Sequence, residues 1–96
     1  MNEQMVQREN EGYVITDSIH IGSTEFVIGQ KDTRFGTMYV TWQCKGRDYY
    51  FWGHYMNSRQ AAEQDLLTRA QQELERQTAK VQEANKSSRS GERGDA

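Results

Sequence analysis

Hydrophobic and polar residues alternate along the first half of the chain in the pattern of antiparallel strands. Tyr13, Ile15, Ile19 and Ile21 stand at odd positions with mostly polar residues between them, which predicts one half-buried strand. Asp17 is a polar residue at an odd position. It therefore predicts a bulge or a strand edge at that point.

A two-residue turn is predicted at Gly22-Ser23, because glycine at the first central position suits a type II′ turn. Closing a hairpin there pairs Ile19 with Phe26 and His20 with Glu25. The apolar pair then lies on one face and the polar pair on the other, which supports this register. We interpret the polar pair as a cross-strand contact, since the middle of an open sheet face is a poor pocket for catalysis.

A second hairpin is predicted for residues 37–44 and 48–55, around Gly46-Arg47. A two-residue loop gives one apolar face and leaves aromatic and polar side chains on the other. That other face carries Tyr39, Thr41, Gln43, Tyr50, Trp52 and His54. A three-residue loop instead puts Tyr50 and Trp52 inside. It turns outward Tyr49, Phe51 and Tyr55.

The C-terminal part of the chain predicts one long helix. Asn57 and Ser58 are candidate caps, and Gln60 follows Asn57 at capping-box spacing. The helix should run from Arg59 into the low eighties, with an apolar stripe that packs on the sheet. The stripe comprises Ala62, Leu66, Leu67, Ala70 and Leu74. We expect the three leucines to be buried with sheet residues, namely Ile19, Phe26 and Trp42.

These elements predict an α+β fold: a four-stranded antiparallel sheet of two hairpins, with one long C-terminal helix packed on one face. We expect a flexible N-terminal segment at residues 1–11 and a single domain at 12–84. Residues 85–96 contain nothing that anchors a core, so they predict a disordered tail.

Composition narrows the function classes. The 96 residues include one cysteine, and no apolar run is long enough for a signal peptide or a membrane span, so we expect a cytoplasmic protein without membrane contact. The net charge is −2, and residues 1–74 hold seven basic and ten acidic residues. Without a basic stripe, direct nucleic-acid binding is the less favoured class.

Catalytic and metal-binding chemistry is not indicated. The sequence lacks a phosphate-binding glycine loop, a nucleophile elbow and a His-Glu-x-x-His motif. His20, Cys44 and His54 are too few and too scattered for a structural zinc site. Cys44 is interpreted as a small core residue, since nothing places a base beside it. We therefore predict a protein that is not an enzyme and needs no cofactor or metal.

Aromatic residues are concentrated in the second hairpin, where residues 39–55 hold seven of the ten. One explanation is core packing, with cover from a terminal segment or a second copy of the chain. The other is an exposed patch for a protein partner, because aromatic residues are enriched at interface hot spots. The candidate partner-binding residues are Tyr39, Tyr50, Trp52 and His54. Oligomeric state is left open.

Several segments of the chain carry a resemblance to known proteins. They are Tyr13-Val14-Ile15 to Gly29, Tyr39-Val40-Thr41-Trp42-Gln43-Cys44, Tyr50-Phe51-Trp52-Gly53-His54-Tyr55 and Ala61-Ala62-Glu63-Gln64-Asp65-Leu66. These segments resemble small proteins carried by plasmids, conjugative elements and phages of low-GC Gram-positive bacteria. Within that group the chain looks most like an anti-CRISPR protein that inhibits the RNA-guided nuclease of type II systems.

The resemblance covers roughly Gly12 to Leu74 and implies inhibition by binding. The expected partner is a CRISPR effector nuclease or its guide-RNA complex. The small protein would occupy a site that the nuclease needs for guide RNA, target DNA or domain movement. The alternative is a single-stranded nucleic-acid binding or accessory module of a conjugative element. It predicts base stacking on the aromatic residues and a steep dependence of binding on salt.

Overall fold

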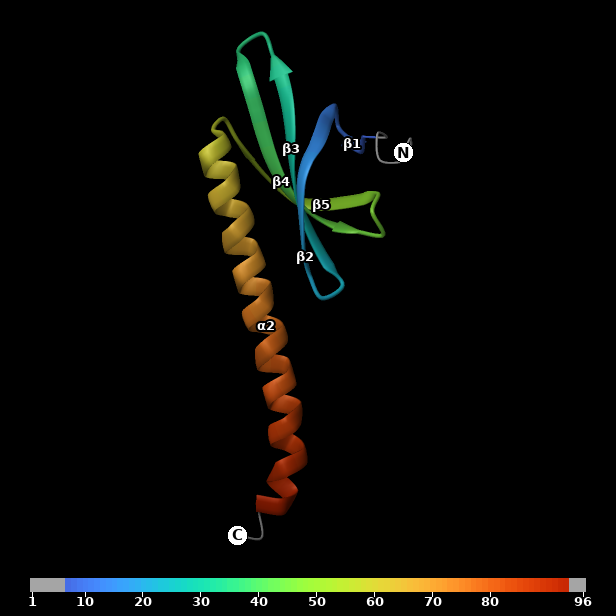
Figure 1. The fold of residues 1–96 in the computed structure, drawn as a ribbon, viewed down its shortest axis with the longest axis vertical. Helices are drawn as coiled ribbons and strands as arrows, with labels where there is room; N and C mark the ends of the chain where they lie inside the picture. Colours follow the sequence, from blue (N-terminus) through green and yellow to red (C-terminus); the bar gives the residue numbers. More distant parts are fainter. Residues whose placement is uncertain (1–6, 94–96) are drawn as a thin grey trace.

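A computed structural model describes residues 7–93, and side chains for residues 7–81. It contains one five-stranded sheet and one helix. The strands are β1 (Glu9–Asn10), β2 (Tyr13–Ile21), β3 (Thr24–Thr33), β4 (Gly36–Lys45) and β5 (Tyr49–Met56), and the helix is α2 (Arg59–Arg93). All neighbouring strands are antiparallel, in the order of the sequence. Helix α2 lies along one face of this meander (Figure 1).

The α+β class and the single helix on an antiparallel sheet are confirmed, whereas the four-strand prediction is wrong. The additional strand is β1, in which Glu9 pairs with Val14 and Asn10 with Tyr13. Two polar residues carry no alternation signal, so the sequence pattern could not reveal this strand. It lies in the segment expected to be flexible. Residues 1–6 are outside the described residues, and the predicted domain limits stay predictions.

The first hairpin has the predicted register, with Ile19 opposite Phe26 and His20 opposite Glu25. The interruption at Asp17 is a bulge, because Ile15 pairs with Gly29 whereas Asp17 pairs with Ile28. One extra residue reverses the alternation of faces. Tyr13 and Ile15 consequently lie on one face of the sheet, and Ile19 and Ile21 lie on the other.

The second hairpin has the three-residue loop, so the two-residue register is wrong. Lys45 pairs with Tyr49 and Cys44 with Tyr50, which leaves residues 46–48 in the turn. A second irregularity follows, because Gln43 pairs with Phe51 whereas Thr41 pairs with His54. Trp42 is therefore opposed by two residues of β5, and Trp52 does not take the inward position that the three-residue loop alone would give it.

The two faces of the sheet carry separate cores. Under α2 the buried residues are Phe26, Ile28, Ala62, Leu66 and Ala70. On the opposite face they are Tyr13, Val27, Val40, Trp42 and Cys44. The expectation that Trp42 packs with the helix is thus wrong. Leu67 and Leu74 are also not buried, with 57% and 46% of their surface exposed. Both lie on the flank of α2, because seven residues are slightly less than two helical turns.

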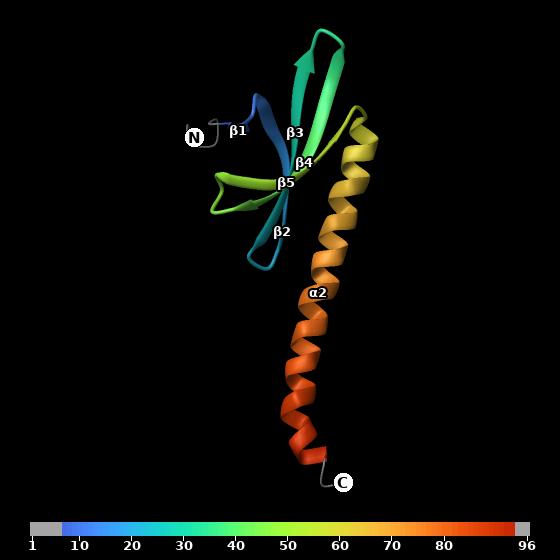
Figure 2. The same cartoon turned by 180° about the vertical axis from the view of Figure 1, so that it is seen from behind.

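Figure 2 shows α2 on one side of the sheet, and on the opposite face residues from β2 and β5 contact each other across the core. The rings of Tyr13 on β2 and Tyr55 on β5 lie 6.0 Å apart, edge to face. The Tyr55 hydroxyl donates to the Glu11 carboxylate at 2.8 Å. Contacts of β2 and of the β1–β2 turn with β5 therefore cover part of this core.

Helix α2 begins at Arg59 as predicted, and of the two candidate caps it is Ser58 whose side-chain oxygen accepts from the Ala61 amide, at 3.1 Å. It continues to Arg93, past the predicted end, and its C-terminal part extends beyond the sheet (Figure 1). The predicted tail at 85–96 stays a prediction, and residues 94–96 lie outside the described residues. Within residues 7–93 no helix combines the length and apolarity that crossing a bilayer needs.

Candidate partner-binding surface

The β5 bulge turns one large aromatic side chain out of the fold. Trp52 has a φ of 55°, a left-handed conformation that bulky residues rarely adopt, and 70% of its surface is exposed. The next residue explains why. A Cβ added to Gly53 would lie 2.7 Å from Nε1 of Trp42, so only glycine can pack its backbone against that buried indole. The bulge places Gly53 over Trp42 and displaces Trp52 outward.

Trp52 belongs to a continuous row of rings on β5. Its ring lies 4.9 Å from that of Phe51, which in turn lies 5.2 Å from the ring of Tyr49. Tyr49 is 61% exposed, and Phe51 is half-buried. We call Tyr49, Phe51 and Trp52 the aromatic row. Exposed adjoining rings of this kind are typical of contact surfaces.

A groove of about 380 Å³ adjoins Trp52, between α2 and the β4–β5 hairpin. It is lined by Phe26 on β3, by Trp52 and His54 on β5, and by Arg69 on α2. The remaining lining residues are Gln43, Gln72, Glu73 and Arg76. We call this feature the groove. It combines an aromatic wall with amide, guanidinium, carboxylate and imidazole groups.

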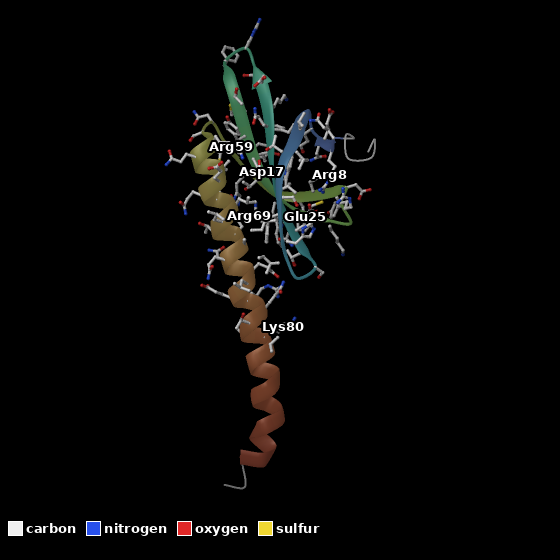
Figure 3. All side chains as sticks on the ribbon, in the orientation of Figure 1. Arg8, Asp17, Glu25, Arg59, Arg69 and Lys80 are labelled. Atoms are coloured by element: carbon white, nitrogen blue, oxygen red, sulfur yellow. The ribbon has the colours of Figure 1, made fainter. Side chains whose placement is uncertain are left out.

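Arg69 is the most deeply placed charged group in the groove. Only 9% of its surface is exposed, and its Nη1 donates to the backbone oxygen and the hydroxyl of Thr41, both at 3.1 Å. Its guanidinium also lies 5.7 Å from the ring centre of Phe26. Burial lowers the pKa of Arg69, and the negative charge of Asp65 only partly opposes this. Figure 3 shows Arg69 between the helix and the sheet.

His54 is held by a carboxylate beside the groove. Its Nδ1 lies 2.9 Å from Oδ2 of Asp65, which also accepts a hydrogen bond from the Thr41 hydroxyl. Burial raises the pKa of Asp65, but the hydrogen bonds from Thr41 and His54 lower it by more. An oriented imidazole is one part of a general-base arrangement. The groove lining offers no Ser, Thr or Cys nucleophile beside it.

Glu73 and Arg76 form the outer part of the groove. The Arg76 Nε donates to Glu73 Oε1 at 3.0 Å, and Gln77 and Thr24 donate to Oε2. The hydrogen bond from Arg76 is the main cause of a low Glu73 pKa of about 2, and burial opposes it. Glu73 is therefore ionised at neutral pH and fully engaged with its own partners. In residues 7–81, no three His, Cys, Asp or Glu side chains converge on a metal site.

The structure brings together only part of the predicted site. Trp52 and His54 both line the groove. Tyr39 lies on the same face but packs against the core under α2. Tyr50 lies on the opposite face, where its ring is 5.4 Å from that of Trp42. A site that includes all four residues is therefore not a single surface.

Sequence reasoning missed the helix side of the groove. Arg69, Gln72, Glu73 and Arg76 recur at spacings of three and four residues, which places them along one face of α2. That spacing was a usable signal for a shared surface. Mixed charge along a helix is also typical of an ordinary solvated face, which obscures this signal.

Comparison with known proteins identifies no relative of this chain. No family model, no curated protein and no solved structure matches it.

Proposed function

We propose that this chain is a non-catalytic binding protein that inhibits a type II CRISPR effector nuclease by occupying part of its surface. The observation that carries the binding role is Trp52, which is both conformationally strained and largely exposed. The resemblance of the chain to anti-CRISPR proteins supports the choice of partner. Such a partner would place the protein in the cytoplasm of a bacterial host.

The strain at Trp52 supports a binding role over incidental exposure. A left-handed conformation costs an L-residue roughly 1–2 kcal/mol. Leaving an indole in water also forgoes the free energy of burying it. Strain of this kind persists at functional sites because the surroundings enforce it, and tryptophan is enriched among interface hot spots. Trp52 meets both descriptions, and Tyr49 extends the same surface.

The test is inhibition of target-DNA cleavage by a purified type II effector with its guide RNA. Added protein should inhibit in a saturable manner near a stoichiometric ratio, without being consumed and without modifying the nuclease. Trp52→Ala should weaken inhibition by about 30-fold, which corresponds to about 2 kcal/mol for a hot-spot residue.

Phe35 provides the matched control, because it is an exposed aromatic outside the groove. It lies at the β3–β4 turn and is 90% exposed. Phe35→Ala should inhibit like the unmodified protein. Equal losses for Phe35→Ala and Trp52→Ala would contradict the assignment of the surface.

The alternative function is a single-stranded nucleic-acid binding module of a conjugative element. One observation favours it: the exposed rings of Tyr49 and Trp52 could stack on unpaired bases. It would replace our proposal if the protein inhibits no related nuclease but binds a DNA oligonucleotide with a steep salt dependence.

A further inference from the structure

We infer that the groove binds a carboxylate side chain of a protein partner on Arg69, with a neighbouring apolar side chain against Trp52. This inference rests on the proposed function, since it specifies what the binding surface recognises. It follows from the position of Arg69, from the remaining charges around the groove, and from the shape that Trp52 gives to its wall.

Arg69 is a buried cation without an ion-pair partner among the described residues. Within residues 7–81, no carboxylate oxygen lies within 4.0 Å of its guanidinium, although 91% of the residue is buried. Buried charges in proteins are normally paired, because removing a charge from water is costly. An anionic group entering the groove would supply the missing partner.

The nearby carboxylates are committed elsewhere. Asp65 accepts from Thr41 and lies against His54, and Glu73 accepts from Arg76, Gln77 and Thr24. Neither carboxylate makes a hydrogen bond with Arg69. Both acidic groups therefore stay with their own partners while the Arg69 guanidinium faces the groove.

Donor groups of Arg69 remain accessible from the groove. All of its hydrogen bonds in the described part of the chain use Nη1, which leaves Nε and Nη2 without a protein acceptor. No fully buried polar side-chain atom among these residues lacks a partner. Nε and Nη2 are consequently within reach of solvent, and the groove lined by Arg69 is the route to them.

A carboxylate fits this site better than a nucleic-acid phosphate. The deep guanidinium suits one anionic group on a short side chain, whereas a phosphodiester chain presents repeated charges. Glu73 lines the groove, and Asp65 lies against the groove residue His54, so a second phosphate would meet negative charge. A ring or aliphatic group beside the carboxylate can pack against exposed Trp52, which favours an acidic protein segment.

The experiment titrates short peptides into the ¹⁵N-labelled full chain and follows the side-chain signals of Arg69 Nε and Trp52 Nε1. The probe is N-acetyl-Phe-Ser-Glu-amide, because the first and third side chains of an extended peptide point the same way. Its control is N-acetyl-Phe-Ser-Gln-amide, which has the same shape without the charge. The acidic peptide should shift both signals and bind about tenfold more tightly than the control.

Substitutions at Arg69 separate charge recognition from general packing. Arg69→Met should abolish the difference between the two peptides, and Arg69→Lys should restore part of it. Arg34→Met is the matched control, since Arg34 lies at the β3–β4 turn, away from the groove. It should leave the difference unchanged. Equal affinity of the two peptides, or a difference that survives Arg69→Met, would overturn the inference.

Failure of the carboxylate site can be distinguished from failure of the proposed function. If the peptides are discriminated but no nuclease is inhibited, the carboxylate site stands and the proposed function fails. If the peptides are not discriminated and Arg69→Met inhibits the nuclease like the unmodified protein, the function stands and the carboxylate site is wrong. If a thymidine oligonucleotide shifts both signals with a steep salt dependence and the acidic peptide does not, the ligand is a nucleic acid.

Discussion

Arg8, which is partly buried, and Arg69, which is buried, differ in how their charges are paired, and both are labelled in Figure 3. Arg8 is enclosed by partners: it donates to both Glu25 oxygens at 2.8 and 3.2 Å, to the Tyr50 hydroxyl, to Cys44 Sγ and to the backbone oxygen of Arg47. Arg69 is more deeply buried and makes no ion pair in the described part of the chain. The difference indicates that Arg8 stabilises the fold, whereas Arg69 is available to a ligand.

Arg8 shows how the first strands and the aromatic row are connected. It lies next to β1, yet its guanidinium reaches the turn between β4 and β5 at the Arg47 carbonyl. Burial raises the pKa of Glu25, but the hydrogen bonds from Arg8 and Ser18 lower it by more, to about 2. The N-terminal segment therefore holds the hairpin whose outer strand carries Trp52.

The largest expected effect is the loss of the Arg8 ion pair. Arg8→Met would leave the Glu25 carboxylate buried without its cation and should lower the free energy of unfolding by about 3–5 kcal/mol. Urea unfolding measures this loss. The double variant Arg8→Met/Glu25→Met removes both charges and should recover most of the stability. A loss below about 1 kcal/mol for Arg8→Met would contradict the structural role.

Lowering the pH should reproduce part of this loss of stability, because it protonates Glu25. The folded pKa of Glu25 is depressed to about 2, so its stabilising contribution is present above about pH 4.5 and is lost as the pH falls toward 2. The shift corresponds to about 3 kcal/mol. Unfolding free energies measured between pH 6 and pH 2 should show this decline. The Arg8→Met/Glu25→Met variant should show a smaller one, caused in part by Glu73.

Arg69→Met should have a much smaller effect on stability than Arg8→Met. It removes two hydrogen bonds to Thr41 but also removes an unpaired buried charge, and these contributions oppose each other. We expect the free energy of unfolding to change by less than about 1 kcal/mol. A loss as large as that of Arg8→Met, measured by the same urea unfolding, would show that Arg69 is mainly structural.

The smallest expected effect is a gain in stability on replacing Trp52. Asparagine tolerates the left-handed conformation better than tryptophan, so Trp52→Asn should raise the free energy of unfolding by about 0.5–1 kcal/mol. Thermal unfolding detects such a change. Phe35→Asn is the comparison, because Phe35 is exposed and its φ is not positive. It should produce no comparable gain, and a destabilised Trp52→Asn would contradict the assignment of strain.

Local chemistry made the first hairpin and the start of the helix predictable. Gly22 adopts the positive φ of 62° that the two-residue turn requires, and the polar Asp17 marked the bulge in β2. Ser58 caps α2 with its own side chain. Each of these features is determined by residues close together in the sequence.

The candidate site depends on contacts that the sequence pattern does not reveal. The β5 bulge exists because Gly53 packs on Trp42, a contact between strands, and periodicity cannot anticipate it. The register shift at this bulge also puts Tyr50 and Trp52 on different faces of the sheet. The four predicted residues therefore do not form one surface. The charge environment of Arg69 likewise depends on where Asp65 and Glu73 find their partners.

The affinity of Trp52→Asn for the type II effector complex tests the central claim most directly. Binding, measured by calorimetry, should weaken by at least about 30-fold in a variant that is as stable as the unmodified protein or more so. Unchanged affinity in the folded variant would contradict the claim that Trp52 is retained for binding.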